Sequence, residues 1–210
     1  SIPEYWKAIS TGKNGINNIS LFDTSDFQVH IAGESDINLT DFLDTKLLNK
    51  IDRFTAFALI ASKQAIKNSN LDINKIQNDR AGVIIGSGIG GMNTFETQHK
   101  RLLKSPRRVS PFFIPSMIPD IASGYVALDN NFKGINYSVV SACASSSHSI
   151  GDAYRNIKHG YSDTIIAGGS EASITPMAIA GFSNMKALTK NPDFNIASRP
   201  FDKNRDGFVI

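Results

Sequence analysis

The sequence predicts an α/β fold for this chain of 210 residues. Four strand-like runs lie at residues 81–86, 135–141, 164–168 and 207–210, and helical patterns separate them. Strands that alternate with helices are typical of α/β architectures, so this alternation indicates the class. At 41% hydrophobic residues the chain can bury a substantial core, arranged as one large domain or two small ones.

Three helices are predicted, one before the first of these strands and two between them. The clearest spans residues 51–68, with Lys63 and Lys67 off an apolar stripe formed by Ile51, Phe54, Phe57, Ala58, Ala61, Ala65 and Ile66. A second helix is predicted for residues 118–128. A third follows Cys143 and ends near His159, where Gly160 favours termination.

Composition excludes several classes of protein. No apolar stretch approaches the roughly 18 residues that a membrane span needs, so no membrane association is expected. The N-terminus shows no signal-peptide pattern. The single cysteine rules out an internal disulfide and suits a reducing compartment, which indicates the cytoplasm, or an organelle lumen if a transit peptide has been removed. A net charge of +3 argues against a dedicated nucleic-acid-binding protein.

The single cysteine, Cys143, is the strongest candidate for chemistry. In the segment NYSVVSACASSSH (residues 136–148) a β-branched run gives way to small hydroxyl residues. Apolar residues then recur at the spacing of a helix with one buried face, at Ile150, Ala153, Tyr154 and Ile157. Cys143 is therefore expected at a helix N-terminus, where free N–H groups and the helix dipole favour a thiolate. The alternative is an inert, buried thiol, a common environment for free cysteine.

A glycine-rich loop follows the first predicted strand. Gly86, Gly88 and Gly91 have the G-x-G-x-x-G spacing of dinucleotide-binding loops, but a lone match is weak. Such a site also needs a second strand ending in Asp or Glu about 20 residues later. Residues 102–108 instead form a basic turn. A tight turn between sheet and helix therefore explains the glycines better, and no cofactor is expected.

The four histidines are His30, His99, His148 and His159. None has the spacing of metal ligands, so no metal site is predicted. His148 lies five residues after Cys143, more than one helical turn away, and should not face the sulfur along that helix. We interpret it as a packing residue or as one that affects the site through a neighbour.

The residues around Cys143 resemble the active-site pattern of the β-ketoacyl synthases of fatty-acid and polyketide synthesis. The matching positions are Gly134, Val139, Ala142, Cys143, Ala144, Ser145, Ser146 and Ile150. Further matches follow in the family's order at IGSGIGG (85–91), SPFFIPS (110–116), IAGGSE (166–171) and ASRPFDKNRDGFV (197–209). The resemblance runs from about residue 5 to the end of the chain and is greatest to the β-ketoacyl-ACP synthases of type II.

This resemblance implies a thiolase-like fold with layers α-β-α-β-α. Residues 1–210 would be its N-terminal half, with a mixed sheet and a buried nucleophile helix, and would lack the opening strand and the C-terminal half. The implied reaction is a decarboxylating Claisen condensation with malonyl-ACP. The two histidines and the lysine that the family uses for decarboxylation lie in its second half, so residues 1–210 alone are not expected to catalyse the full reaction. The family unit is a homodimer, and residues 135–141 are the candidate for the two-fold interface.

The resemblance also assigns roles to residues. Cys143 would carry the acyl group, and its own N–H would donate one of two hydrogen bonds to the oxyanion. Ile89 and Phe182 would bound the acyl pocket, although a phenylalanine between small residues is more often plain core. A basic patch would dock the acidic acyl carrier protein, although charged residues usually only solvate a surface. The patch comprises Lys46, Lys50, Arg107 and Arg108, and one family arginine is replaced by Asn49.

Two alternatives stay open at this stage. One is a polyketide-type ketosynthase, which shares the same motifs. The other is a non-catalytic partner subunit with the same fold. Such subunits lack the cysteine, so the presence of Cys143 favours an enzyme.

Overall fold

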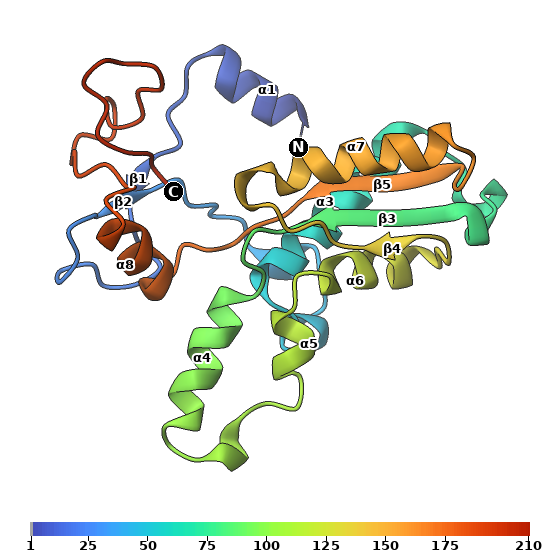
Figure 1. Ribbon diagram of the computed structural model, residues 1–210, viewed down its shortest axis with the longest axis horizontal. Helices are drawn as coiled ribbons and strands as arrows, with labels where there is room; N and C mark the ends of the chain where they lie inside the picture. Colours follow the sequence, from blue (N-terminus) through green and yellow to red (C-terminus); the bar gives the residue numbers. More distant parts are fainter. Residues whose placement is uncertain (1) are drawn as a thin grey trace. The chain divides into compact units, whose positions relative to one another are not determined.

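The computed structural model describes residues 2–210, and they form two compact units. The first, called the sheet unit below, is Asn38–Ser173. The second, called the terminal unit, combines residues 2–37 with Ile174–Ile210. Figure 1 shows the elements of both units along the chain.

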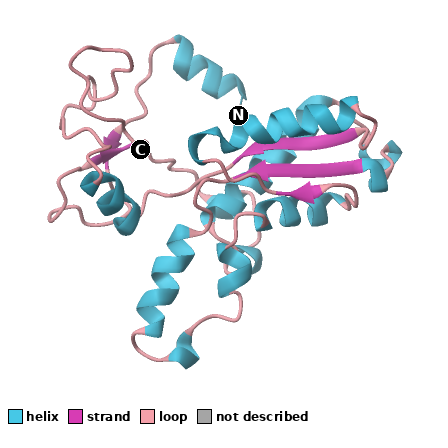
Figure 2. Cartoon of the chain, in the orientation of Figure 1, coloured by secondary structure: helices cyan, strands magenta, loops and turns pink. Residues whose placement is uncertain are grey.

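The sheet unit confirms the predicted α/β class. Its central strand β3 (Ala81–Gly86) pairs in parallel with β4 (Asn136–Tyr137) on one side and with β5 (Thr164–Gly169) on the other (Figure 2). All six residues of β3 are buried. A continuous apolar run is what a central parallel strand requires, because both of its faces are covered.

Two of the four predicted strands are confirmed, one is shorter than predicted and one does not form. β3 and β5 lie where the sequence predicts them. Residues 135–141 form a paired strand only at Asn136–Tyr137, because the pairing with β3 stops at Ile84. Residues 207–210 form no strand, and a single bridge joins Phe208 to Leu188.

Two helices pack on the sheet, and a third packs against one of them. α7 (Ser145–Lys158) contacts β5 and β3, and α6 (Ile121–Asn130) contacts β3 and β4. α3 (Arg53–Ser69) packs against α6. Short elements complete the unit: α2 (Thr45–Leu48) and the 3₁₀ turns η1 (Leu39–Asp41), η2 (Ile73–Lys75) and η3 (Asn78–Arg80).

The three predicted helices are present, but their boundaries and buried residues differ in part from the prediction. α3 begins after Asp52, whose carboxylate accepts a hydrogen bond from the N–H of Phe54 and so caps the helix. The apolar stripe predicted for this helix is buried in its first half, but Ala61 and Ala65 are exposed. The helix predicted for residues 118–128 begins later, because Ile118 is extended before Pro119 and separates α6 from α5 (Phe113–Met117).

An arm projects from the sheet unit in Figure 1. It consists of α4 (Met92–Leu102), the 3₁₀ turn η4 (Pro106–Arg108) and α5. The rings of Phe95 and Phe113 lie 6.5 Å apart between α4 and α5. The predicted basic turn at residues 102–108 is confirmed as the end of α4 and η4.

The terminal unit has its own small core. It contains α1 (Ile2–Ser10), α8 (Pro176–Asn184) and the antiparallel pair β1 (Asn17–Asn18) and β2 (Ile31–Ala32). The core cluster consists of Ile19, Val29, Ala32, Ile179 and Leu188.

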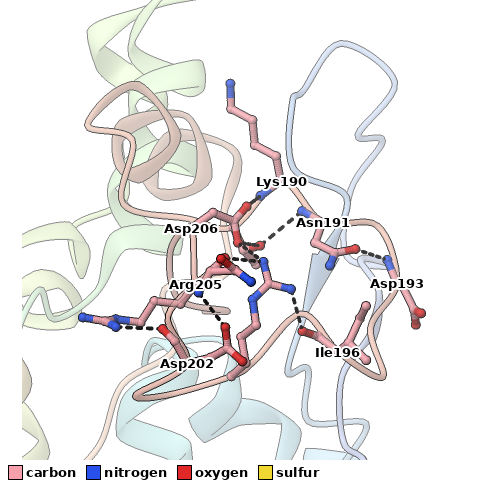
Figure 3. Close-up of polar contacts among 10 residues, drawn as sticks. Lys190, Asn191, Asp193, Ile196, Asp202, Arg205 and Asp206 are labelled. Carbon is pink, nitrogen blue, oxygen red and sulfur yellow. Dashed lines mark hydrogen bonds and ion pairs between the residues drawn. The ribbon is translucent and has the colours of Figure 1, made fainter.

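Polar contacts hold the long C-terminal loop of the terminal unit (Figure 3). The carboxylate of Asp206 accepts hydrogen bonds from the hydroxyl of Thr189 at 2.7 Å and the N–H of Lys190 at 3.2 Å. It also pairs with Arg199 at 3.0 Å. The hydroxyl of Thr189 is the main cause that lowers the pKa of Asp206 below its ordinary value. The two ends of the loop, near residues 190 and 206, are therefore tied together.

Within residues 2–210, no helix combines the length and the apolar character needed to cross a membrane. The same residues contain no cluster of three or more His, Cys, Asp or Glu side chains suited to a metal ion.

Asp52 links two helices through one buried carboxylate. Its two oxygens accept from the N–H of Phe54 at 3.3 Å and from the N–H of Thr94 at 2.7 Å. Burial raises its pKa, and these hydrogen bonds oppose the rise only in part. The stability contributed by this group is therefore fully present below the unfolded-state pKa of about 3.9 and decreases as pH rises toward the folded-state pKa.

We expect Asp52→Asn to destabilise the chain by about 1–3 kcal/mol near pH 4, because the amide places an NH2 donor, where the acid has an oxygen, against one of the two N–H groups. The difference from the wild type should shrink toward pH 7, since only the wild type loses stability there. Asp163→Asn is a control of opposite sign, because Arg80 lowers the pKa of Asp163. Its difference from the wild type should grow with pH. Denaturant unfolding at pH 4 and pH 7 measures these differences in the free energy of unfolding. The same difference between Asp52→Asn and the wild type at both pH values would contradict the prediction.

Candidate functional site

Cys143 lies in the 3₁₀ turn η5 (Ala142–Ala144), directly before α7. The predicted position at a helix N-terminus is therefore confirmed. The side chain is exposed among the described residues, so the alternative of a buried thiol is wrong. Ala142 has φ +51°, in the left-handed region that non-glycine residues rarely adopt. The turn that presents the sulfur is thus a strained one.

Serines of α7 hold this turn. The hydroxyl of Ser145 donates to the carbonyl of Ala142 at 2.7 Å and accepts from the N–H of Ser141 at 2.9 Å. Within residues 2–210 the N–H of Cys143 has no hydrogen-bond partner. An N–H that is free beside a thiol can stabilise negative charge on an oxygen bound next to the sulfur.

The glycine-rich loop approaches the turn closely. A Cβ atom on Gly86, at the end of β3, would lie 2.6 Å from the carbonyl oxygen of Ser145. Similarly, a Cβ on Gly169, at the end of β5, would lie 2.6 Å from the Cβ of Ser146. Glycine at both positions lets the carboxyl ends of two strands approach the start of α7, and the interpretation of the loop as a tight turn between sheet and helix is confirmed.

Glu171 fixes the glycine-rich loop beside the turn. Its carboxylate accepts hydrogen bonds from the N–H groups of Gly88 at 2.7 Å and Ile89 at 3.0 Å. The hydroxyls of Ser87 and Ser173 donate to its other oxygen at 3.2 and 2.9 Å. The sequence pattern alone predicts no role for Glu171. A signal was present: the residue follows a parallel strand by two positions, so it lies at the sheet edge where the loop also begins.

The two predicted pocket residues lie in different units. Ile89 is half-buried in the loop that Glu171 holds, in the same unit as Cys143. Phe182 belongs to α8 of the terminal unit. It is half-buried, packs against the core cluster of that unit and meets the ring of Phe208 edge-on at 5.5 Å.

The predicted docking residues Lys46, Lys50, Arg107 and Arg108 are all exposed in the sheet unit. Lys50 is joined to the arm, because its ammonium lies 5.4 Å from the ring centre of Phe112 and its carbonyl accepts from the hydroxyl of Ser116 at 2.7 Å.

Only one of the four histidines contacts the turn that carries Cys143. Nδ1 of His148 lies 2.7 Å from the hydroxyl of Ser141. His99 stacks on Phe95, and the hydrogen-bonding partner of His30 is Thr24. The side chain of His148 is exposed, and its ring contacts Ser141, a neighbour of Cys143.

The outer face of α7 differs from the prediction. Ala153 is buried as expected, but Ile150, Tyr154 and Ile157 are 54%, 62% and 43% exposed. The prediction that these three are buried is wrong for the described residues. The helix instead turns its small residues, among them Ser145, Ser149 and Ala153, toward the sheet.

An apolar cavity of about 220 Å³ lies elsewhere in the sheet unit. Its walls come from the C-terminal part of α3, η2, Phe132 and residues 164–167 of β5. Residues 164–167 form the start of β5, whereas Cys143 lies beside the carboxyl end of that strand. The cavity is therefore separate from the turn that carries the thiol.

Comparisons with known proteins agree on one family. The sequence profile described as "Beta-ketoacyl synthase, N-terminal domain" matches residues 1–210. The 3-oxoacyl-[acyl-carrier-protein] synthase 2 of Staphylococcus aureus is 50% identical over 207 residues, which are 98% of this chain and 51% of that protein. The enzyme of the same name from Synechocystis sp. is 47% identical over 213 residues, 100% of this chain and 51% of that protein.

Solved structures give the same result. A β-ketoacyl synthase from Burkholderia phymatum STM815 is 28% identical, with a TM-score of 0.86 over 100% of this chain and 52% of that one. The ishigamide ketosynthase/chain length factor is 25% identical, with a TM-score of 0.88 over 99% of this chain and 51% of that one. The predicted thiolase-like fold is thereby confirmed, and the chain spans about half the length of the curated relatives it matches.

Because the profile covers every residue of the chain and relatives of this family are about half identical to it, the chain belongs to the β-ketoacyl synthases and corresponds to their N-terminal domain.

Proposed function

We propose that this chain is the nucleophile-bearing half of a 3-oxoacyl-[acyl-carrier-protein] synthase of fatty-acid elongation. The observation that carries the proposal is the exposed Cys143 on a strained turn before α7, beside its own free N–H, in a chain that matches the family throughout. The names of the half-identical relatives favour fatty-acid synthesis over the polyketide alternative.

In the proposed first step the thiolate of Cys143 attacks the carbonyl carbon of an acyl thioester. The oxyanion that forms accepts a hydrogen bond from the N–H of Cys143. Collapse of this intermediate breaks the bond to the carrier's sulfur, which leaves as a thiolate and takes up a proton. The acyl group stays on Cys143 until malonyl-ACP loses carbon dioxide and its carbanion attacks the acyl carbonyl carbon. A C–C bond then forms, the C–S bond to Cys143 breaks and frees the thiolate, and the acyl chain, longer by two carbons, is carried on the carrier protein.

The proposed partner is an acyl carrier protein, which is acidic. Lys46, Lys50, Arg107 and Arg108 are exposed in the unit that carries Cys143, and none of them has an ion-pair partner within residues 2–210. Free cations can steer an acidic protein by long-range attraction.

A homodimer in the cytoplasm is proposed on separate grounds. β4 pairs with β3 on one side only among the described strands, and Val140 just after it is 59% exposed. An open strand edge near residues 135–141 suits a two-fold contact. The single free thiol suits a reducing compartment.

We expect Cys143→Ala to abolish acylation of the intact protein, because the proposed step needs the thiolate of Cys143 as its nucleophile. Mass spectrometry after incubation with acyl-ACP, or with a cerulenin-type epoxide, should find the adduct on Cys143 in the wild type alone. Cys143→Gln should keep malonyl-ACP decarboxylation, which separates loss of the nucleophile from loss of the fold. An active wild type without an adduct on Cys143 would refute the proposal.

We expect Ile89→Phe to reduce activity on long acyl chains more than on short ones. Added aromatic volume in a packed channel costs about 1–3 kcal/mol, and only long chains reach that depth. Ile89→Leu is the control, because it keeps the volume. Initial rates over a series of acyl-ACP lengths measure the effect. Equal loss at every length would mean that Ile89 only supports the loop.

We expect charge reversal at Lys46, Lys50, Arg107 and Arg108 to raise KM for acyl-ACP and to make it less sensitive to salt, while turnover of acyl-pantetheine stays unchanged. Lys67→Glu, on the exposed end of α3, is the matched control. Steady-state kinetics with both substrates at low and moderate salt test the proposal. Equal losses with both substrates would assign these residues a structural role instead.

A further inference from the structure

We propose that His148 is a positioning residue for Cys143 and that it acts through Ser141. This inference rests on the proposed function, because it concerns how the turn presents the thiol and its N–H. The observation behind it is the 2.7 Å contact between Nδ1 of His148 and the hydroxyl of Ser141, two residues before the cysteine.

The contact completes a two-point attachment of the turn to α7. Ser145, in the first turn of the helix, holds the backbone of Ser141 and Ala142 through its hydroxyl. His148, three residues further along, holds the side chain of Ser141. The residues just before Cys143 are thus fixed both by their backbone and by a side chain.

The turn needs this support because Ala142 has φ +51°. Such a conformation is costly for alanine and persists only where its surroundings enforce it. The N–H of Cys143 belongs to the peptide group between Ala142 and Cys143. A change in the backbone of Ala142 would therefore re-aim the N–H and the sulfur together.

Among the described residues the His148 ring has one hydrogen-bonding partner, Ser141. The side chain of His148 is exposed. The ring does not contact the sulfur through a hydrogen bond. It acts on Cys143 through the turn and takes no proton from the thiol.

The chemistry of the contact suggests the matched variants. The amide of asparagine carries a polar atom at the same number of bonds from Cα as Nδ1, so His148→Asn can keep the contact with Ser141. His148→Leu keeps the bulk and removes the polar atom. Ser141→Ala removes the other partner. His159→Leu, at the far end of α7, is the control for a histidine that does not reach the turn.

The experiment measures how fast an acyl-pantetheine thioester acylates Cys143 in the intact protein, followed by mass spectrometry. A misplaced oxyanion donor and nucleophile should cost about ten-fold or more in this rate for His148→Leu and for Ser141→Ala. The double variant should be no slower than the slower single variant, since both remove one contact. His148→Asn should recover most of the rate, and His159→Leu should match the wild type.

Alkylation of Cys143 by iodoacetamide separates the two proposals. The alkylation rate reports the placement of the thiol and needs no acyl substrate. We expect the variants to rank in the same order by alkylation rate as by acylation rate, with smaller differences between them. If the wild type takes no acyl group, the proposed function fails and the alkylation rates decide the role of His148. Three results would each overturn the positioning role. The first is an unchanged rate of Cys143 modification in His148→Leu, and the second is a loss in the double variant equal to the product of the two single losses. The third is a His148→Asn variant as slow as His148→Leu.

Discussion

The close approach of β3 to the start of α7 is the contact on which the site depends. Gly86 ends the strand directly against the carbonyl of Ser145, and no side chain fits between them. The glycine-rich loop must therefore leave the strand beside the turn that carries Cys143. Glu171 then fixes that loop from the neighbouring strand through two backbone N–H groups. The parallel arrangement makes this possible, because the carboxyl ends of β3 and β5 lie at the same edge of the sheet.

The site is thus built mainly from backbone contacts and small polar side chains. The hydroxyl of Ser145 holds the strained alanine before the cysteine, and the hydroxyl of Ser149 donates to the carbonyl of Ser145 within α7. Small residues also let the helix lie close to the sheet, so the sulfur stays at the surface of the unit. An acyl thioester can reach such a thiol, whereas it could not reach a thiol in the core.

The sequence predicts the parts of the fold that depend on local pattern. The central strand is a continuous apolar run, the glycines follow it directly, and the helix after Cys143 ends at Lys158, two residues before Gly160, so all three are predicted well. Family motifs predict the nucleophile and the fold. Local pattern does not reveal Glu171, because its role arises only when β5 pairs with β3 and brings the carboxylate to a loop more than 80 positions away in the chain.

Two of the errors share one physical cause: periodicity shows that a face is apolar but does not show what covers it. The stripe of Ile150, Tyr154 and Ile157 has helical spacing and was predicted to be buried, but the described residues leave it exposed. The same reasoning overextended the strand at residues 135–141, whose apolar residues continue after pairing with β3 has stopped.

Apolar area that stays in water forfeits about 25 cal/mol per Å², so an uncovered stripe and strand edge are costly. On the proposed function this surface has a use, because both features flank the turn that carries Cys143, and a cover placed over them would exclude water from the acylated thiol. A drier site would also strengthen the hydrogen bond from the Cys143 N–H to the oxyanion.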